Sequence, residues 1–297
     1  MLEISHLRSF VAVAEELHFG RAAERLNMTQ PPLSRQIQIL EHNMKCKLFE
    51  RSSRSVQLTT AGANFLPEAK RVLRNLEFAT SVAQDVAAGR KGIVRCGFTA
   101  SSVYEFLPRL VAELERQIPG ASLRLSEMVS REQAAALRSG DIEIGILRDA
   151  TELEDFERSL LLSEPMVVAL PNEHPLVDQK RLKWLDLHRQ RFLGYEPQAA
   201  KYFADLIGAK LSAEGVSPTF VQHLSQIHSI LSLVRSGTGL AVVPRSAQMI
   251  SISGVVFREF EDPTSIVCEL YSVWRGESLN PLVPLVADIA SRCGDHP

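Results

Sequence analysis

The sequence predicts an α/β protein with a small, mostly helical domain at the N-terminus and a larger, two-lobed α/β domain behind it. Three observations support this prediction. The first sixty residues contain short amphipathic helical segments, and about three heptads of regularly spaced apolar residues follow them. From residue 93 onward, short apolar strands alternate with helical stretches, a pattern typical of α/β folds with mainly parallel strands.

The first helix is expected from about Ser5 to Leu17. Its apolar residues recur at helical spacing, which makes them core residues rather than a ligand site. These residues are Leu7, Phe10, Val11, Val13, Ala14 and Leu17.

Two more helices, joined by a three-residue turn, are expected between Phe19 and Met44. The first has one apolar face, formed by Ala22, Ala23 and Leu26. Thr29 is a good N-cap for the second, and the residues after it fall in a first turn whose N–H groups have no intrahelical partner. The prolines in this turn, Pro31 and Pro32, are therefore compatible with a helix start.

The second of these helices has a buried stripe and a polar outer face. Its apolar residues Leu33, Ile37, Leu40 and Met44 are spaced by four, three and four. The spacing leaves these polar residues facing outward: Gln30, Ser34, Arg35, Gln36 and Gln38. Arg side chains can hydrogen-bond guanine and Gln side chains adenine, so this face predicts a helix that contacts DNA bases. The alternative is an ordinary helix face exposed to solvent.

A hairpin is expected from Leu48 to Thr59, with its turn at Ser52 and Ser53. Arg51 and Arg54 cluster at its tip, so that it is similar to a wing that contacts phosphates or a minor groove. Lys plus Arg outnumber Asp plus Glu by 8 to 6 in the first sixty residues, whereas the rest of the chain has 25 against 29. DNA binding is thus inferred from where the charge lies, since the net charge is −2.

The segment from Thr60 to Ala88 predicts a helix with a heptad seam. Its apolar positions alternate by four and three: Phe65, Ala69, Val72, Leu76, Ala79, Ala83 and Val86. This spacing favours two paired helices, parallel or antiparallel, over a single amphipathic helix on a globular core. Pro67 fits only if the helix begins near Phe65 or bends there, and the glycines at 89 and 92 end it.

The remaining residues are expected to form two similar lobes. ALRSGDIEIGI around Gly140 and LVRSGTGLAVV around Gly237 both combine a helix, an RSG turn and a strand. The second lobe should start near Met166, with PNEHP as a hinge, and the chain should return to the first lobe near Cys268. The expected domains are 1–59, a linker helix 60–89, and 90–297, with lobe I about 92–163 and 268–297 and lobe II about 164–267.

The cleft between such lobes is expected to bind a small molecule. Thr99, Ser101 and Ser102 follow the strand that ends at Phe98, and Ser130 opens a later helix. Hydroxyls and free N–H groups at helix starts favour an anion, and a carboxylate is the natural choice. The alternative to an anion site is that these Ser and Thr residues are ordinary helix N-caps.

Enzyme signatures are absent: there is no GxSxG, HExxH or GxxxxGK[ST] motif. His223 and His228 lack metal-ligand spacing, and the four cysteines are scattered, as expected of buried thiols. We therefore expect no cofactor, no metal and no catalysis. With no signal peptide and no run of about eighteen apolar residues, a cytoplasmic protein without membrane contact is expected. An alternative function is that of a two-lobed binding protein or enzyme, in which the N-terminal part serves only for oligomerisation.

The run HLRSFVAVAEELHFGRAAERLNMTQPPLSRQIQILE, followed by LFERSSRSVQLTTAG, resembles the LysR-type transcriptional regulators, and the resemblance extends over the whole chain. It implies recognition-helix contacts at Gln30, Pro31, Pro32, Ser34 and Arg35, with Gln38 on the same face, and a wing contact at Arg54. It also implies a linker helix that pairs subunits, and an effector domain similar to a periplasmic binding protein. A homotetramer on a bent operator, acting with RNA polymerase, is the expected assembly.

GFTASSVYEFLPRL and SEMVSREQ resemble the branch that responds to benzoate and cis,cis-muconate in aromatic degradation. The resemblance places effector hydroxyls at Ser101 and Ser130, and an opposing wall at Tyr195 and Phe203. Arg148 is the expected counter-ion. Glu196 departs from the branch and would repel a second carboxylate, which favours an aromatic monoacid over muconate. A regulator that needs no effector stays an open alternative.

Overall fold

The computed structural model describes residues 3–51, 56–87 and 92–294. The chain divides into two compact units, Met1–Arg90 with Arg138–Asp141 and Lys91–Leu137 with Ile142–Pro297. None of the described helices is both long and apolar enough to span a membrane.

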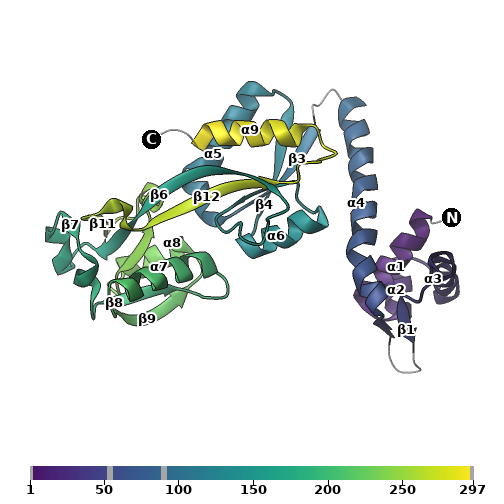
Figure 1. Cartoon of the computed structure of the whole chain (residues 1–297), viewed down its shortest axis with the longest axis horizontal. Helices are drawn as coiled ribbons and strands as arrows, with labels where there is room; N and C mark the ends of the chain where they lie inside the picture. Colours follow the sequence, from purple (N-terminus) through teal and green to yellow (C-terminus); the bar gives the residue numbers. More distant parts are fainter. Residues whose placement is uncertain (1–2, 52–55, 88–91, 295–297) are drawn as a thin grey trace. The chain divides into compact units, whose positions relative to one another are not determined.

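The first unit is mostly helical (Figure 1). It closes around Phe10 and Val13, which are fully buried. Its elements are α1 (Ile4–Glu16), α2 (Phe19–Arg25), α3 (Gln30–Met44), β1 (Phe49–Arg51), β2 (Val56–Leu58) and α4 (Thr60–Ala87). The prediction was wrong for Leu17, which is 47% exposed. It caps α1 with a left-handed backbone (φ 46°) and so lies beyond the buried face of the helix.

The helix-turn-helix and the hairpin follow the sequence pattern. Helix α3 begins after Thr29 with its prolines in the first turn, and Leu33, Ile37 and Leu40 are fully buried. Strands β1 and β2 pair antiparallel, from Phe49↔Leu58 to Arg51↔Val56. Ser52, Ser53 and Arg54, predicted at the hairpin tip, lie outside the described residues, as does the side chain of Arg51.

Helix α4 begins at Thr60, where the sequence predicted it, and Pro67 lies in its interior. The helix therefore does not begin near Phe65, which was one of the two ways in which Pro67 was expected to fit. The start at Thr60 is explained by Thr59, whose Oγ1 accepts a hydrogen bond from the Gly62 N–H at 3.0 Å. Phe65 and Ala69 pack against the core of the same unit. The heptad seam is therefore not available to a second helix along its whole length, because Phe65 and Ala69 already pack within the chain.

Lobe I of the second unit has one sheet covered on both faces. The strand order is β4-β3-β5-β12-β6, with β3, β4 and β5 parallel and the other two antiparallel. Helices α5 and α9 cover one face and α6 the other (Figure 1). The bounds are β3 (Gly92–Phe98), η1 (Ala100–Tyr104), α5 (Phe106–Gln117), β4 (Ala121–Glu127), α6 (Ser130–Ser139), β5 (Ile144–Leu147), β6 (Glu157–Pro171), β12 (Val267–Trp274) and α9 (Leu282–Gly294).

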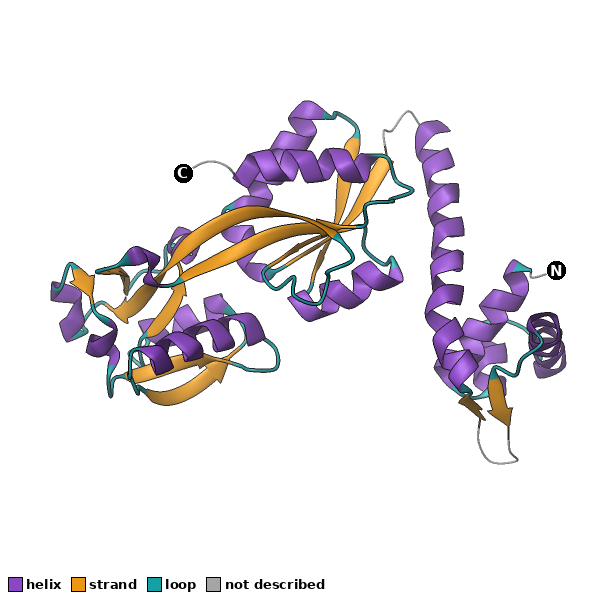
Figure 2. Cartoon of the chain, viewed as in Figure 1, coloured by secondary structure: helices purple, strands orange, loops and turns teal. Residues whose placement is uncertain are grey.

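In lobe II, α8 packs against the second half of β6 and against β10, whereas α7 packs against β8 (Figure 2). Strands β10 and β11 pair antiparallel with β6, while β7 pairs with β11 and β8 with β9 in parallel. The sheet of this unit is thus more mixed than the mainly parallel one predicted. The bounds are η2 (Pro175–Asp178), β7 (Arg181–Leu182), η3 (Trp184–Leu187), β8 (Arg191–Tyr195), α7 (Lys201–Ala213), β9 (Thr219–Leu224), α8 (Ile227–Arg235), β10 (Ala241–Pro244), η4 (Arg245–Ile250), β11 (Val255–Phe260) and η5 (Pro263–Ser265).

The two lobes are joined by β6 and β12, which run side by side as an antiparallel pair from Val267↔Pro165 to Trp274↔Glu157. The predicted hinge at PNEHP was wrong, because this turn lies inside lobe II, where Leu176 joins the core. The predicted internal echo is present: Gly140 follows α6 at φ +77° and Gly237 follows α8 at φ +75°. Both glycines adopt the left-handed conformation that ends a helix.

Candidate functional site

The outer face of α3 presents polar side chains to solvent. Gln30, Arg35 and Gln38 are exposed, together with Pro31 and Pro32, while Ser34 is half-buried. The side chains that reach outward are thus the ones that can hydrogen-bond base edges or phosphates.

Gln36 differs from its neighbours on this face. Its side-chain oxygen accepts a hydrogen bond from the Ser9 hydroxyl of α1, and the residue is half-buried. The prediction that it faces outward was therefore wrong: its amide holds α3 against α1.

Glu41 links the last turn of α3 to the hairpin. Its carboxylate is almost completely buried and accepts hydrogen bonds from the N–H groups of Leu48 (3.0 Å) and Phe49 (3.2 Å), and Lys47 Nζ lies 3.0 Å away. Burial raises the pKa of this carboxyl, but these donors outweigh burial and leave the pKa below its ordinary value. The start of β1 is thereby fixed relative to α3.

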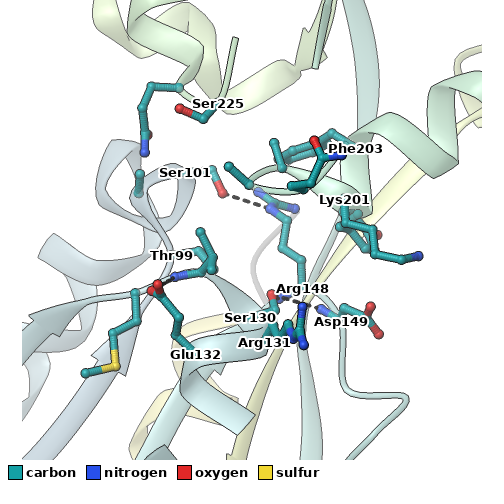
Figure 3. Close-up of a pocket in the computed structure, with 18 of the residues that line it drawn as sticks. Thr99, Ser101, Ser130, Arg131, Glu132, Arg148, Asp149, Lys201, Phe203 and Ser225 are labelled. Carbon is teal, nitrogen blue, oxygen red and sulfur yellow. Dashed lines mark hydrogen bonds between the residues drawn. The ribbon is translucent and has the colours of Figure 1, made fainter. Parts of the chain in front are cut away.

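A cavity of about 550 Å³ lies between the two lobes (Figure 3). Its lobe I wall is formed where the parallel strands β3, β4 and β5 end, at Thr99, Met128 and Arg148. Lobe II contributes residues 197–203, after β8, and 225–227, after β9. Carboxyl ends of parallel strands are where open α/β sheets bind ligands.

Two serine hydroxyls face this cavity, and each accepts at least one hydrogen bond from the protein (Figure 3). Ser101 Oγ accepts a hydrogen bond from Arg148 Nε at 2.9 Å. Ser130 Oγ, at the first residue of α6, accepts from the N–H groups of Arg148 (3.3 Å) and Asp149 (3.4 Å). Because each oxygen already accepts a hydrogen bond from the protein, its own hydroxyl proton is left to donate to a ligand.

Arg148 lines the cavity but is already paired. Its Nη2 lies 2.9 Å from the Glu164 carboxylate on β6, and both side chains are almost completely buried. Glu164 also accepts hydrogen bonds from the N–H (2.7 Å) and hydroxyl (3.1 Å) of Ser246. The charge of Arg148, the predicted counter-ion, is therefore neutralised by Glu164. Through this pair and Ser246, lobe I is connected to β6 and to lobe II. The sequence pattern did not predict this partner, and Glu164 stands out only as the single acid in the apolar stretch that follows Ser163.

Ser102 and Tyr195 were predicted in the site, but neither lines this cavity. Ser102 is buried in η1, where its hydroxyl donates to the Thr99 carbonyl at 2.7 Å. Ser101 and Ser102 both lie within the short η1, and α5 begins only at Phe106, so no long helix begins at these serines. Thr99 does line the cavity, and its Oγ1 is buried without a hydrogen-bond partner among the described residues.

Phe203 forms the aromatic wall of lobe II. Its ring stacks on that of Tyr195 (centroids 4.9 Å apart), meets Tyr202 edge-on and lies 5.2 Å from the Arg148 guanidinium. Tyr195 therefore supports the wall from behind. Its hydroxyl is buried without a partner among the described residues, and burial raises its pKa well above the ordinary value.

The lining also contains carboxylates that the sequence analysis did not single out. They are Glu127, Glu132, Asp149 and Glu152. Glu196, predicted as the acid near the mouth, is not among them. Burial and the Glu127 carboxylate raise the pKa of Tyr104, another lining residue, to about 12.

Cys96 and Cys268 are buried thiols of the second unit. Burial raises the pKa of the Cys96 and Cys268 thiols to about 12, which keeps them protonated. Within the described part of the chain, no three His, Cys, Asp or Glu side chains are grouped to hold a metal ion.

Both units match family models. Residues 4–63 match the bacterial regulatory helix-turn-helix protein of the lysR family, and residues 87–292 match the LysR substrate binding domain. The full-length structure of CbnR, a LysR family transcriptional regulator, superposes with a TM-score of 0.75 at 25% identity, covering 99% of this chain and 100% of CbnR.

Among curated relatives, the transcriptional regulator AlsR of Bacillus subtilis is 36% identical over 95% of this chain and 93% of its own length. The regulator BenM of Acinetobacter baylyi is 34% identical over 89% of this chain and 88% of its own length. These relatives are named as regulators of transcription and not as enzymes. The chain belongs to the LysR family of DNA-binding transcriptional regulators and combines its helix-turn-helix with its substrate-binding domain.

Proposed function

We propose that this LysR-family regulator binds a small carboxylate between its two lobes and that this binding changes how it holds its operator. The exposed face of α3, with Gln30, Ser34, Arg35 and Gln38, enters the major groove, and the hairpin with Arg51 and Arg54 contacts the DNA backbone. Metabolism of aromatic acids is the setting that the sequence resemblance favours.

The observation that carries the effector proposal is the pair of serine hydroxyls. Ser101 and Ser130 each have a lone pair occupied by a donor from the protein, so both are set to donate. Ser130 also opens α6, whose first N–H groups favour negative charge. Two hydroxyl donors beside a helix start suit the two oxygens of one carboxylate.

The assembly is proposed to be a homotetramer, a dimer of dimers, in which α4 pairs subunits. On this helix Val72 is 46% exposed and Ala79 is exposed, so the middle of the seam is available to a second chain. Paired recognition helices bind two half-sites, and their coupling raises affinity without new contacts. RNA polymerase is the partner that such an operator complex would recruit.

An effector acts in this proposal through the two lobes that it touches. It can shift an equilibrium between two arrangements only by binding one more tightly than the other. A ligand that contacts both Ser101 of lobe I and Phe203 of lobe II favours one arrangement of the lobes, and operator bending changes with it.

Calorimetry tests this proposal with full-length protein and benzoate as the probe. The wild type should bind one benzoate per chain, and the Ser101→Ala, Ser130→Ala double variant should bind at least about tenfold more weakly, because two charge-assisted hydrogen bonds are lost. Ser102→Ala is the matched control and should bind as the wild type does. Equal affinity of the double variant and the wild type would refute the carboxylate site.

A further inference from the structure

Lys201 lines the cavity from lobe II, at the first residue of α7. Its side chain is 69% exposed, which places it where the cavity opens to solvent. Its ammonium pairs with the carboxylate of Asp205, one turn further along the same helix. An exposed ion pair within one helix contributes little to stability, so Lys201 can change its partner at little cost.

Two acids of lobe I line the same cavity, in the loop that follows β5. They are Asp149 and Glu152 (Figure 3 labels Asp149 and Lys201). The Asp205 carboxylate raises the pKa of Lys201 most, and the carboxylates of Asp149 and Glu152 raise it further. Among the described residues, however, the ion-pair partner of Lys201 is Asp205. Lys201 is thus within electrostatic reach of lobe I while it is bonded only within lobe II.

The carboxylate of Asp149 is held in place with one oxygen open to a cation. Its Oδ1 accepts hydrogen bonds from the N–H (3.1 Å) and the hydroxyl (2.6 Å) of Thr151, whereas no donor among the described residues reaches Oδ2. The N–H of Asp149 donates to Ser130 Oγ at 3.4 Å, so this acid lies beside a hydroxyl of the proposed carboxylate site. A movement of lobe II toward a ligand at Ser130 therefore brings Lys201 toward Asp149.

We propose that Lys201 is a positioning residue that closes the cavity: when lobe II moves onto a bound carboxylate, its ammonium leaves Asp205 and pairs with Asp149, beside Glu152. The inference rests on the carboxylate site proposed above and gives Lys201 a role that needs no contact with the ligand. Because the new ion pair joins the two lobes, it stabilises the closed, ligand-bound arrangement relative to the open one. Ligand affinity then depends on a contact between two protein side chains.

Calorimetry with the full-length protein and benzoate tests this role through the sign of the effect. Asp149→Asn keeps the acceptor of the Thr151 hydrogen bonds and removes the charge with which Lys201 would pair. If Asp149 acted only on the ligand, this variant would bind the benzoate anion more tightly, because a repulsion is removed. The closing pair predicts the opposite, a loss of about threefold in affinity for Asp149→Asn and for Lys201→Gln. Asp205→Asn should bind benzoate more tightly, since Lys201 is released from its present partner.

The double variant shows whether the two residues act as a pair. In the Lys201→Gln background, Asp149→Asn should cause no further loss, because either change alone removes the contact. Lys210→Gln is the matched control: it removes the comparable Lys210–Glu214 pair from the same helix, outside the lining, and should bind benzoate as the wild type does. Tighter binding by Asp149→Asn, or losses that add up in the double variant, would overturn the inference.

Disulfide trapping tests the contact between the lobes without relying on affinity. Lys201→Cys with Glu152→Cys is made in a Cys46→Ser chain, because the other native cysteines are buried. On oxidation the two thiols should form a disulfide slowly in the free protein, and at least about threefold faster with benzoate, which populates the closed arrangement. Lys210→Cys with Glu152→Cys is the control and should stay reduced.

The outcomes separate this inference from the proposal on which it rests. Benzoate binding to the wild type without any cross-link, in its presence or absence, would overturn the closing contact and leave the carboxylate site intact. If benzoate failed to bind the wild type, the carboxylate site would be wrong. A cross-link in the free protein would then still support the closing contact, and its absence would overturn that contact as well.

Discussion

The Arg148 guanidinium and the Glu164 carboxylate form an ion pair of 2.9 Å that is almost completely shielded from water. Arg148 follows β5 in lobe I, whereas Glu164 lies on β6, which crosses to lobe II. Ser101 on one side and Ser246 on the other complete the hydrogen bonds of the pair. A buried charge pair therefore lies at the wall of the cavity between the lobes.

Removing one member of this pair should cost more than removing both. In Glu164→Leu, Arg148 is left as a buried cation without its partner, and we expect the free energy of unfolding to fall by about 3 to 5 kcal/mol. The double variant Arg148→Met, Glu164→Leu should recover a large part of this loss. Urea unfolding of the second unit measures both, with the exposed Glu154→Leu as control. A double variant less stable than Glu164→Leu would contradict the account.

Glu41 should be essential to the stability of the first unit. Glu41→Ala leaves the N–H groups of Leu48 and Phe49 without their acceptor, and we expect a loss of about 2 to 4 kcal/mol in urea unfolding. Glu50→Ala, at an exposed position of β1, is the matched control and should change stability little. Equal stability of the two variants would show that the hairpin does not depend on Glu41.

The same carboxyl should make stability depend on pH. Because the pKa of Glu41 is lower in the folded state, its contribution is complete above the ordinary pKa of a glutamate and is lost as pH falls through the lowered value. Between neutral and acidic pH, the wild type should therefore lose more stability than Glu41→Ala. If the free energies of unfolding of the wild type and Glu41→Ala fell equally across this pH range, the assigned hydrogen bonds would be wrong.

Features of the fold that depend on residues close together in the chain could be predicted from the sequence. The buried stripe Leu33, Ile37, Leu40 and the helix stops at Gly140 and Gly237 were predictable, because helical spacing and left-handed backbone are local properties. Leu17 fits the same spacing yet is exposed, since the helix ends one residue before it.

The candidate site was predictable only in part. Thr99, Ser101, Ser130 and Arg148 follow strand ends, and parallel strands bring such positions to one edge of the sheet. The partner of Arg148 was not predictable, because Glu164 meets it only through the long strand β6 that crosses between the lobes. Tyr195 was misplaced for a similar reason: the orientation of its ring depends on its stacking against Phe203 on α7.

Arg35 should contribute sequence-specific binding to DNA. Arg35→Ala should weaken binding to the operator by about 1 to 3 kcal/mol and weaken non-specific binding much less, because a base contact is lost. Fluorescence anisotropy with operator and scrambled duplexes at one salt concentration measures this difference. Arg124→Ala, an exposed arginine of the second unit, is the control. An equal loss on both duplexes would indicate a phosphate contact instead.

Val72 should lie in a contact between subunits. It is 46% exposed on α4, so Val72→Glu should leave the fold of the chain intact while placing charge in the proposed helix pair. Sedimentation velocity should show a smaller assembly than for the wild type. Asn75→Glu, on the same helix and outside the seam, should leave the assembly unchanged. An unaltered assembly of Val72→Glu would exclude pairing through this seam.

Replacing both Ser101 and Ser130 by Ala should remove the response of the operator complex to its ligand. The bend of a doubly labelled operator, measured by fluorescence energy transfer, should change with benzoate for the wild type. For the double variant, the operator should be bound with unchanged affinity, but its bend should no longer respond to the ligand. A double variant that still changes the bend at the same ligand concentration would contradict the account.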